Sequence, residues 1–130
     1  MRRGAEDGGQ AAVEVALVLP LLALLLLLLV QVGLVVRDQV LVVHAAREAA
    51  RAAAVESGDA APHRAAMLSG GLDRKRLDTR IVSDGSRVVG ATVGVEVTYR
   101  SPTEVPLVGA LLGDPELRAT AAMRVEGDEQ

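Results

Sequence analysis

The residue of this sequence whose type and position most clearly suggest a chemical role is Glu14, a carboxylate at the start of a long apolar run. Residues 15–30 carry no polar side chain, so Glu14 lies about one turn inside an apolar helix. A carboxylate costs about 2.5–3.5 kcal/mol at the centre of a membrane-spanning helix, and less near its amino end, where the helix dipole favours negative charge. Two interpretations follow. Glu14 either reaches the head groups or caps its own helix, or it pairs with an opposite charge within the membrane.

Elsewhere the sequence offers no catalytic constellation. The absence of cysteine excludes disulfides, thiol nucleophiles and cysteine metal sites. His44 and His63 are isolated from any spaced carboxylate pair, no serine lies in a G-x-S-x-G frame, and Gly70-Gly71 is no phosphate loop. After residue 36 the 12 basic and 14 acidic residues give no basic surface for nucleic acid. We therefore expect no enzymatic activity, metal, cofactor, small-molecule substrate or nucleic-acid partner.

The apolar segment that must position Glu14 is long enough to cross a membrane. Of its 26 residues, 11–36, 22 are apolar, and as a helix it is about 39 Å long against a hydrocarbon core of about 30 Å. The apolar region of a signal peptide is shorter and ends in a small-residue cleavage site, whereas the best such site here, Val43-His44-Ala45, lies beyond Arg37. A membrane anchor is favoured. The other part of the chain has few large apolar residues, no Phe and no Trp, which leaves it near the limit of independent folding.

The order of residues around Glu14 resembles the processing signal of type IV pilin-like proteins. A short charged leader ends at Gly9, and Glu14 is the fifth residue counted from Gln10. The resemblance implies that a prepilin peptidase cuts between Gly9 and Gln10 at the cytoplasmic face. It also implies that the new ammonium group and a glutamate on a neighbouring subunit compensate each other, because opposite charges attract strongly in a low dielectric and an unpaired one is costly.

The wider run GGQAAVEVALVLP resembles the start of TadE-like proteins, which are pilin-like components of Tad (tight adherence) pilus systems. That family commonly opens with Gly-x-Ala-x-Val-Glu-(Phe)-Ala-x-x-x-Pro. Val15 replaces the usual aromatic, and the residues that match in order are Gly9, Ala11, Val13, Glu14, Ala16 and Pro20. Pro20 removes one backbone hydrogen bond and is expected to kink the helix locally, although membrane helices also tolerate proline. A second run, AAREAARAAAV over 45–55, resembles the family as well.

Beyond the apolar run the sequence predicts an amphipathic stem helix. Most of its polar residues, Asp38 among them, fall on one half of the helical wheel. The opposite side carries a heptad-like seam of small residues formed by Val42, Ala46, Ala49 and Ala53. Small residues allow close approach of another surface, so this seam packs on the chain's own sheet, on neighbouring subunits, or on both at different heights. Arg47 and Arg51 also belong to the candidate stem contacts, and salt bridging, helix solubility or a partner contact would each account for them.

The remainder of the sequence predicts a small antiparallel sheet. We expect a short helix over 62–68, a weak strand over 80–83, a turn at Asp84-Gly85 and two strands with clear alternation over 89–99 and 117–126. One face, rich in Val, Ala and Tyr, is expected to pack against the stem helix, since a sheet needs a covering layer. Glu96 is a candidate to pair across strands with Arg118 or Arg124. The apolar stretch 106–112 reads as one helical turn or a membrane-proximal loop.

The predicted fold class is a membrane-anchored, pilin-like α+β protein, in which a long N-terminal helix packs on a small antiparallel sheet. The expected organisation is a leader segment over 1–9, a transmembrane helix over 10–36 and a stem helix over 37–58. A small exported α+β domain over 59–126 and a polar tail over 127–130 follow.

The resemblance implies a minor pilin or pseudopilin-like structural subunit of a Tad pilus or a related secretion system. Such a subunit crosses the cytoplasmic membrane once, with the N-terminus cytoplasmic and the C-terminal domain outside. Its implied partners are the membrane, a prepilin peptidase, other pilin-like subunits and the Tad assembly machinery. Arginines at the two ends of the span, two before and three after, do not by themselves set the orientation. The alternative is an unprocessed, single-pass anchored protein whose small outer domain binds a partner.

Overall fold

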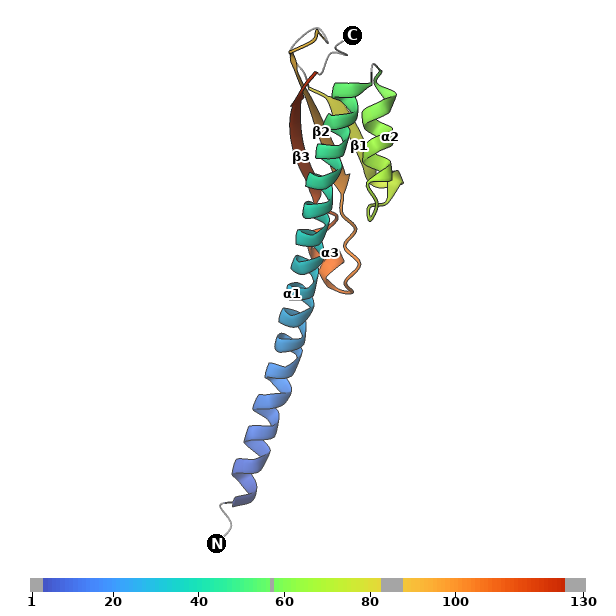
Figure 1. The fold of residues 1–130 in the computed structure, drawn as a ribbon. Coiled ribbons are helices and arrows are strands. Elements are labelled where there is room, and N and C mark those ends of the chain that lie inside the picture. Colours follow the sequence, from blue (N-terminus) through green and yellow to red (C-terminus); the bar gives the residue numbers. More distant parts are fainter. Residues whose placement is uncertain (1–3, 57, 83–87, 126–130) are drawn as a thin grey trace. The chain divides into compact units, whose positions relative to one another are not determined.

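A computed structural model of the chain describes residues 4–56, 58–82 and 88–125, with side chains from residue 9 onward. The elements are α1 (Gly4–Val55), α2 (Ala60–Leu68), a 3-10 turn η1 (Arg74–Arg76), β1 (Leu77–Ile81), β2 (Thr92–Arg100), α3 (Val108–Leu112) and β3 (Glu116–Arg124), as Figure 1 shows. The chain forms two compact units. Unit 1 comprises Met1–Gly33 and Thr103–Gly113, and unit 2 comprises Leu34–Pro102 and Asp114–Gln130.

Unit 2 contains a three-stranded antiparallel sheet in the order β1-β2-β3. The central strand β2 alternates between buried apolar and more exposed polar residues, as expected of a strand with one face on the core. Its register places Val95 opposite Ile81 on one side and Ala121 on the other, so the apolar faces of the three strands coincide. Helices α1 and α2 both cover this face of the sheet (Figure 1).

The core of unit 2 joins the small-residue side of α1 to the apolar face of the sheet. Small side chains, mostly alanine on the helix and valine on the central strand, fill the space between the two surfaces. The buried residues of this cluster are Val42, Ala45, Ala46, Ala49, Ala50, Ala53, Ala54, Ala66, Leu77, Val93, Val95, Val97 and Tyr99. The predicted fold class is confirmed: a long N-terminal apolar helix packs through its C-terminal part on a small antiparallel sheet, in a chain with a candidate membrane span.

Several boundaries differ from the predicted ones for identifiable reasons. The first strand is Leu77–Ile81 rather than 80–83, because Leu77 pairs with Tyr99 at the buried face while charged residues alternate on the other face and weaken the apolar pattern. Strand β2 begins at Thr92 rather than 89, because Gly90, at φ +90°, turns the chain just before it. Helix α2 begins at Ala60, two residues earlier than expected. The predicted turn at 84–85 lies outside the described residues.

Candidate functional site

The site predicted from the sequence begins on α1, where Gly9, Gln10 and Glu14 share one face of the helix. Together with Val13 and Leu17 they line one shallow hollow of about 450 Å³. Residues four apart are neighbours on a helix surface, so Glu14 lies about 6 Å along the axis from Gln10. The exposed carboxylate is therefore one helical turn from the peptide bond between Gly9 and Gln10.

Gly9 leaves the backbone open at this bond. A Cβ atom built at Gly9 would meet nothing within 4 Å, so the structure around it offers no packing reason for glycine. Helix α1 begins at Gly4, and the bond between Gly9 and Gln10 therefore lies in helical backbone. A peptidase that acts here has to unwind this end of the helix, since a helical carbonyl is occupied by its own hydrogen bond.

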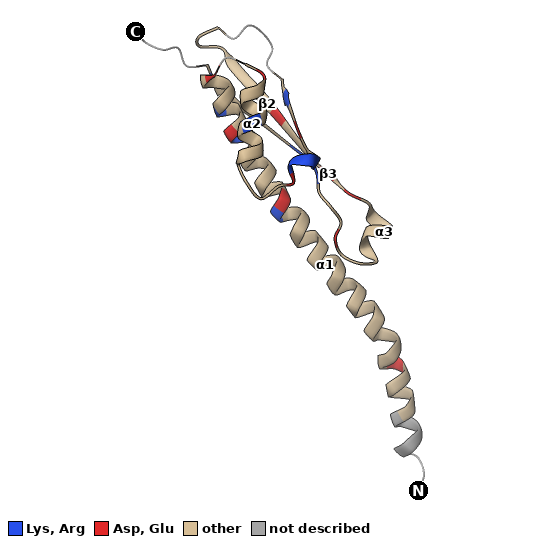
Figure 2. Cartoon of the chain, turned by 90° about the vertical axis from the view of Figure 1, so that its right-hand side faces the viewer, with Lys and Arg blue, Asp and Glu red and all other residues tan. Residues whose placement is uncertain are grey.

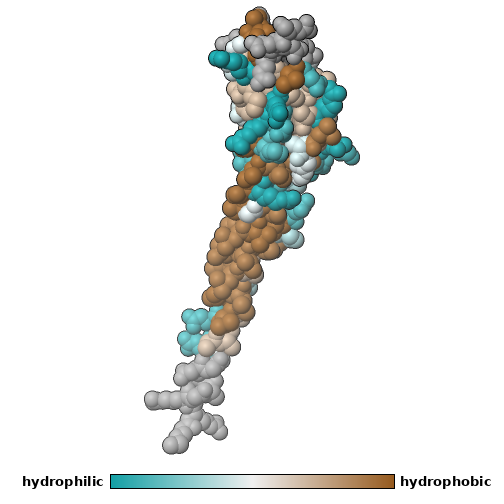
Figure 3. All heavy atoms as spheres, viewed as in Figure 1, coloured by the Kyte–Doolittle hydropathy of each residue, from teal (hydrophilic) through white to brown (hydrophobic). Residues whose placement is uncertain are grey.

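The surface around Glu14 is apolar and uncovered. Leu17 is 74% exposed and Leu21 is 67% exposed, and no part of the most apolar window of α1 is buried. In Figure 3 the hydrophobic colour covers the face of this helix that is in view, and in Figure 2 charged residues concentrate after it. Within the described ranges one helix is long and apolar enough to span a membrane, and so large an apolar surface is not typical of a water-exposed protein.

Pro20 lies inside α1, and the helix continues on both sides of it. A proline has no N–H, so the carbonyl of Ala16, four residues earlier, lacks its usual helical donor. The local kink expected from the sequence stays a prediction.

The stem residues divide into two groups. Ala46, Ala49 and Ala53 lie in the core of unit 2, where the sheet of the same chain covers them. Arg47 and Arg51 are exposed on the other side of the helix. The structure thus brings the alanines together with the sheet and leaves the two arginines at the surface. Gly9, Gln10 and Glu14 belong to unit 1 and form a separate group.

Asp38 lies in a different environment from the one that the sequence predicts. The helical wheel places it on the polar half of the stem, but in the structure it is only 9% exposed, and it accepts a 2.7 Å hydrogen bond from the Ser101 hydroxyl. Ser101 is fully buried at the end of β2, and its backbone N–H donates to the Pro115 carbonyl at 3.0 Å. This buried pair ties α1 to the point where β2 ends and β3 approaches. Ser101 is 63 residues away from Asp38 in the sequence, so no local sequence pattern reveals this hydrogen bond.

Ser101→Ala is expected to destabilise unit 2 by about 1.5–3 kcal/mol, the usual range for a hydrogen bond to a charged group. The substitution leaves the Asp38 carboxylate in place without its Ser101 donor. Tyr99 is the single aromatic residue and is 3% exposed, so its fluorescence during urea unfolding of the full chain in detergent measures the change. Thr120→Ala, on the exposed face of β3, is the control and should leave the midpoint unchanged. Equal midpoints for the two variants would show that the Asp38 bond contributes nothing.

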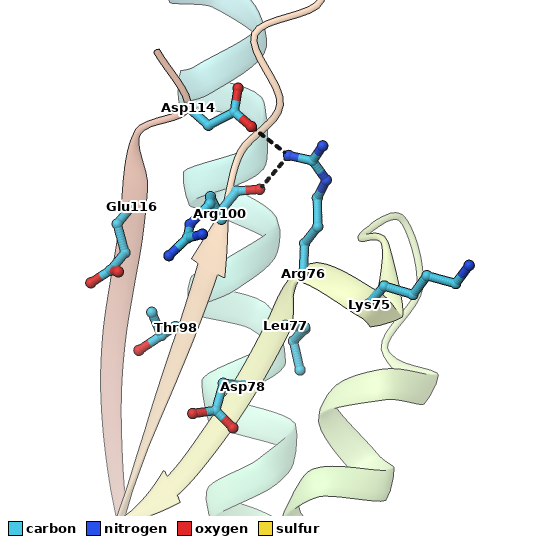
Figure 4. A pocket seen from close by; sticks show the side chains of 8 residues that line it. All are labelled: Lys75, Arg76, Leu77, Asp78, Thr98, Arg100, Asp114 and Glu116. Atoms are coloured by element: carbon cyan, nitrogen blue, oxygen red, sulfur yellow. Dashed lines mark hydrogen bonds and ion pairs between the residues drawn. The ribbon is translucent and has the colours of Figure 1, made fainter.

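The exposed face of the sheet carries a cavity of about 520 Å³ with acidic and basic residues around it (Figure 4). The Arg76 guanidinium donates to Asp114 at 2.8 Å and to the Arg100 carbonyl at 3.5 Å. The hydrogen bond to Asp114 raises the pKa of Arg76, which is already cationic at any physiological pH. Any stabilisation from a raised pKa is fully present below the ordinary pKa of arginine, far above physiological pH, so it gives no pH switch near neutrality. The cavity brings together salt-bridging groups and no nucleophile–base pair.

Charge pairing on this face also differs from the expected cross-strand pair. Arg118 forms a salt bridge with Glu116, two residues away on the same strand. This hydrogen bond is the main cause of the raised pKa of Arg118, and Glu96 makes a smaller contribution. Glu96 lies opposite Arg80 and Thr120 in the register. Such exposed pairs contribute under about 1 kcal/mol and shape the surface more than the stability.

Gln31 is a polar residue of the apolar helix that the sequence patterns did not single out. It is 2% exposed, and neither its Nε2 nor its Oε1 has a hydrogen-bond partner in the part of the chain that the structure describes. In the sequence, the only signal of its unusual position is that it is a polar residue within a run of Leu and Val residues. Because an unpaired buried amide destabilises by about 1–3 kcal/mol, Gln31 marks a strained position in unit 1.

The histidines show no ligand arrangement. His63 Nδ1 lies 3.3 Å from the Thr79 hydroxyl, which joins α2 to β1, and His44 is exposed on α1. Across residues 4–56, 58–82 and 88–125, no three His, Cys, Asp or Glu side chains gather in a group that could hold a metal ion.

Comparison with known proteins gives one family match, in the N-terminal part of the chain. The family model described as TadE-like protein matches residues 9–51. No curated protein and no solved structure matches the chain. The match begins at Gly9, includes Glu14 and Pro20, and extends through Arg47 to Arg51. Residues 9–51, about a third of the chain, are therefore similar to the TadE-like family.

Proposed function

We propose that this protein is a minor pilin or pseudopilin-like structural subunit of a Tad pilus or a related secretion system, released from its leader by a prepilin peptidase. One observation carries the proposal. A carboxylate, Glu14, lies one turn beyond the bond between Gly9 and Gln10, on an apolar helix surface that none of the residues described by the structure covers. The match of this segment to the TadE-like family supports the same assignment.

Cleavage after Gly9 would convert a neutral peptide group into an ammonium group at Gln10. Glu14 would then lie in the first turn of the shortened helix, where the dipole favours a negative charge. Pairing of the ammonium group of one subunit with Glu14 of the next neutralises both charges in the low dielectric of the membrane. Only subunits at matching height can pair in this way, so the pair also sets the axial register of neighbouring helices.

The orientation that goes with this function places the leader in the cytoplasm and unit 2 outside the cytoplasmic membrane. The alanine seam is filled by the chain's own sheet, so a neighbour would have to displace the sheet to reach it. We therefore assign stem contacts with other pilin-like subunits to the exposed Arg47 and Arg51. No step of this function requires catalysis or a cofactor.

Processing is expected to yield a membrane form that starts at Gln10. Intact-mass and N-terminal sequencing of the protein from cells with an active prepilin peptidase measure this directly. Gly9→Val is expected to block cleavage, because a branched side chain then stands at the scissile bond where the peptidase approaches the backbone. Gly4→Ala, in the same leader but away from the bond, is the matched control and should be processed normally.

A membrane form that keeps Met1, or one that starts well inside the apolar run, would refute the processing step. The chain would then fit the unprocessed anchored protein with an outer partner-binding domain. Normal cleavage of Gly9→Val would refute the assignment of the site to this bond.

A further inference from the structure

The segment of unit 1 that connects β2 to β3 presents three leucines to its surroundings. Leu107, Leu111 and Leu112 are 68%, 76% and 61% exposed. Between Glu104 and Asp114 the segment carries no charged residue. Three exposed leucines within six residues are unlike the scattered apolar residues of an ordinary water-facing surface.

Several hydrogen bonds form within this segment. Gly109 N–H donates to the Val105 carbonyl at 3.3 Å and Gly113 N–H donates to the Gly109 carbonyl at 3.1 Å. The Thr103 hydroxyl closes the two ends of the segment by donating to the Gly113 carbonyl. An excursion of the chain into an apolar medium requires such internal pairing, since no water is present there to replace it.

Leu107 is held in a conformation that packing within the chain does not explain. Its φ of +68° lies in the left-handed region that side chains other than glycine rarely adopt. The conformation leaves its side chain exposed, while Val105 and Val108 on either side are buried. Strain of this kind persists where the surrounding structure or the function requires it.

The segment belongs to the same compact unit as the apolar part of α1. The buried residues described in this unit are Gln31 of the helix and Val105 and Val108 of the segment. If Glu14 marks one boundary of the hydrocarbon core, about 20 helical residues place the other boundary near residue 34. The segment therefore lies beside the helix close to the outer boundary of the membrane.

We propose that residues 103–113 form a second membrane contact, a short apolar wedge that inserts Leu107, Leu111 and Leu112 among the lipid acyl chains of the outer leaflet. This inference rests on the membrane span of the proposed function, and is independent of processing and assembly. The apolar surface of the wedge continues that of the spanning helix in the same unit, so a lipid surface covers both. The flanking carboxylates, Glu104 and Asp114, remain in the head-group region or in water.

The test uses the full chain, whose lack of cysteine permits single-cysteine labelling. Leu111→Cys and Leu107→Cys carry a polarity-sensitive fluorophore, and each protein is reconstituted at low density into vesicles of phosphatidylcholine and phosphatidylglycerol. We expect blue-shifted emission, quenching by nitroxide-labelled lipids and loss of quenching by aqueous iodide. Leu24→Cys, within the span, is the lipid-facing reference, and Thr120→Cys, exposed on β3, is the water-facing reference.

Two results would overturn the wedge while leaving the span intact. Iodide quenching at position 111 with lipid quenching at position 24 would place the segment in water. A label at 111 that is shielded from both quenchers would show that protein, such as a second copy of this chain, covers the leucines. Iodide quenching at position 24 would overturn the membrane span of the proposed function together with the wedge.

Discussion

Replacement of Glu14 by alanine is expected to abolish association with other pilin-like subunits while the protein still inserts into the membrane. Insertion becomes easier, because the substitution removes a carboxylate from an apolar helix. Association fails because the ammonium group of a processed neighbour loses its partner at membrane depth. Breaking a buried ion pair costs about 3–5 kcal/mol. Partial exposure near the helix end reduces this to about 3 kcal/mol, or a roughly hundredfold weaker association.

The charge and the side-chain size of Glu14 can be separated experimentally. Glu14→Gln keeps the size and hydrogen-bonding capacity but removes the charge, and it should fail as completely as Glu14→Ala. Glu14→Asp keeps the charge on a shorter side chain and should retain part of the association. The measurement is co-isolation of the tagged chain with the pilin-like subunits of the same system from mild detergent, with membrane content determined in parallel.

Glu56→Ala is the matched control for these variants. Glu56 directly follows α1 and also carries a negative charge. Its salt bridge with Arg64, at 3.4 Å, is formed by two exposed side chains. Its loss should leave association unchanged, since exposed pairs contribute little. Normal co-isolation of Glu14→Ala would contradict the charge-pairing role and favour the unprocessed anchored protein.

The elements that the sequence predicts best are those whose environment is periodic. Strands β2 and β3 alternate because one face lies on the core and the other on solvent, and this alternation is visible in the residues themselves. The helical nature of α1 follows equally from its uninterrupted apolar run and the alanine-rich stem. Strand β1 was misplaced by three residues at its start because only Leu77 and Ile81 mark its inner face with large apolar side chains.

The features that the sequence could not reveal depend on contacts between distant segments. The sequence suggests that Asp38 is a polar surface residue, whereas in the structure it is hydrogen-bonded to Ser101 at the end of β2. The sequence likewise suggests that Gln31 is a minor interruption of the apolar helix, whereas in the structure it is buried in unit 1. Neither residue belongs to a local motif, so their roles follow from the tertiary structure alone.

The candidate site is the opposite case, because it is wholly local. Gly9, Gln10 and Glu14 lie within six residues and line one hollow, and any helix places Gln10 and Glu14, which are four residues apart, next to each other on one face. What completes the proposed site is a charge from a second molecule. A single chain therefore shows where the carboxylate lies, and the association experiment has to supply the partner.

Ala49→Glu is expected to unfold unit 2 while leaving the apolar helix in the membrane. Ala49 is fully buried in the cluster that contains Val95 and Val97. An unpaired carboxylate there carries a penalty of several kcal/mol, comparable to the total stability of about 5–15 kcal/mol of a native domain. The thin alanine-rich core makes the low end of that range the relevant one. Loss of the buried environment of Tyr99, seen by its fluorescence without denaturant, is the measurement.

Ala52→Glu is the matched control, since it makes the same change three residues later at a half-buried position of the same helix. Glutamate and alanine have similar helix propensities, so this variant should remain folded. The pair of variants decides between the two uses of the alanine seam. If the seam serves neighbouring subunits, Ala49→Glu keeps Tyr99 buried and loses only association. If the seam serves the chain's own sheet, as the buried cluster indicates, unit 2 unfolds before any neighbour is involved.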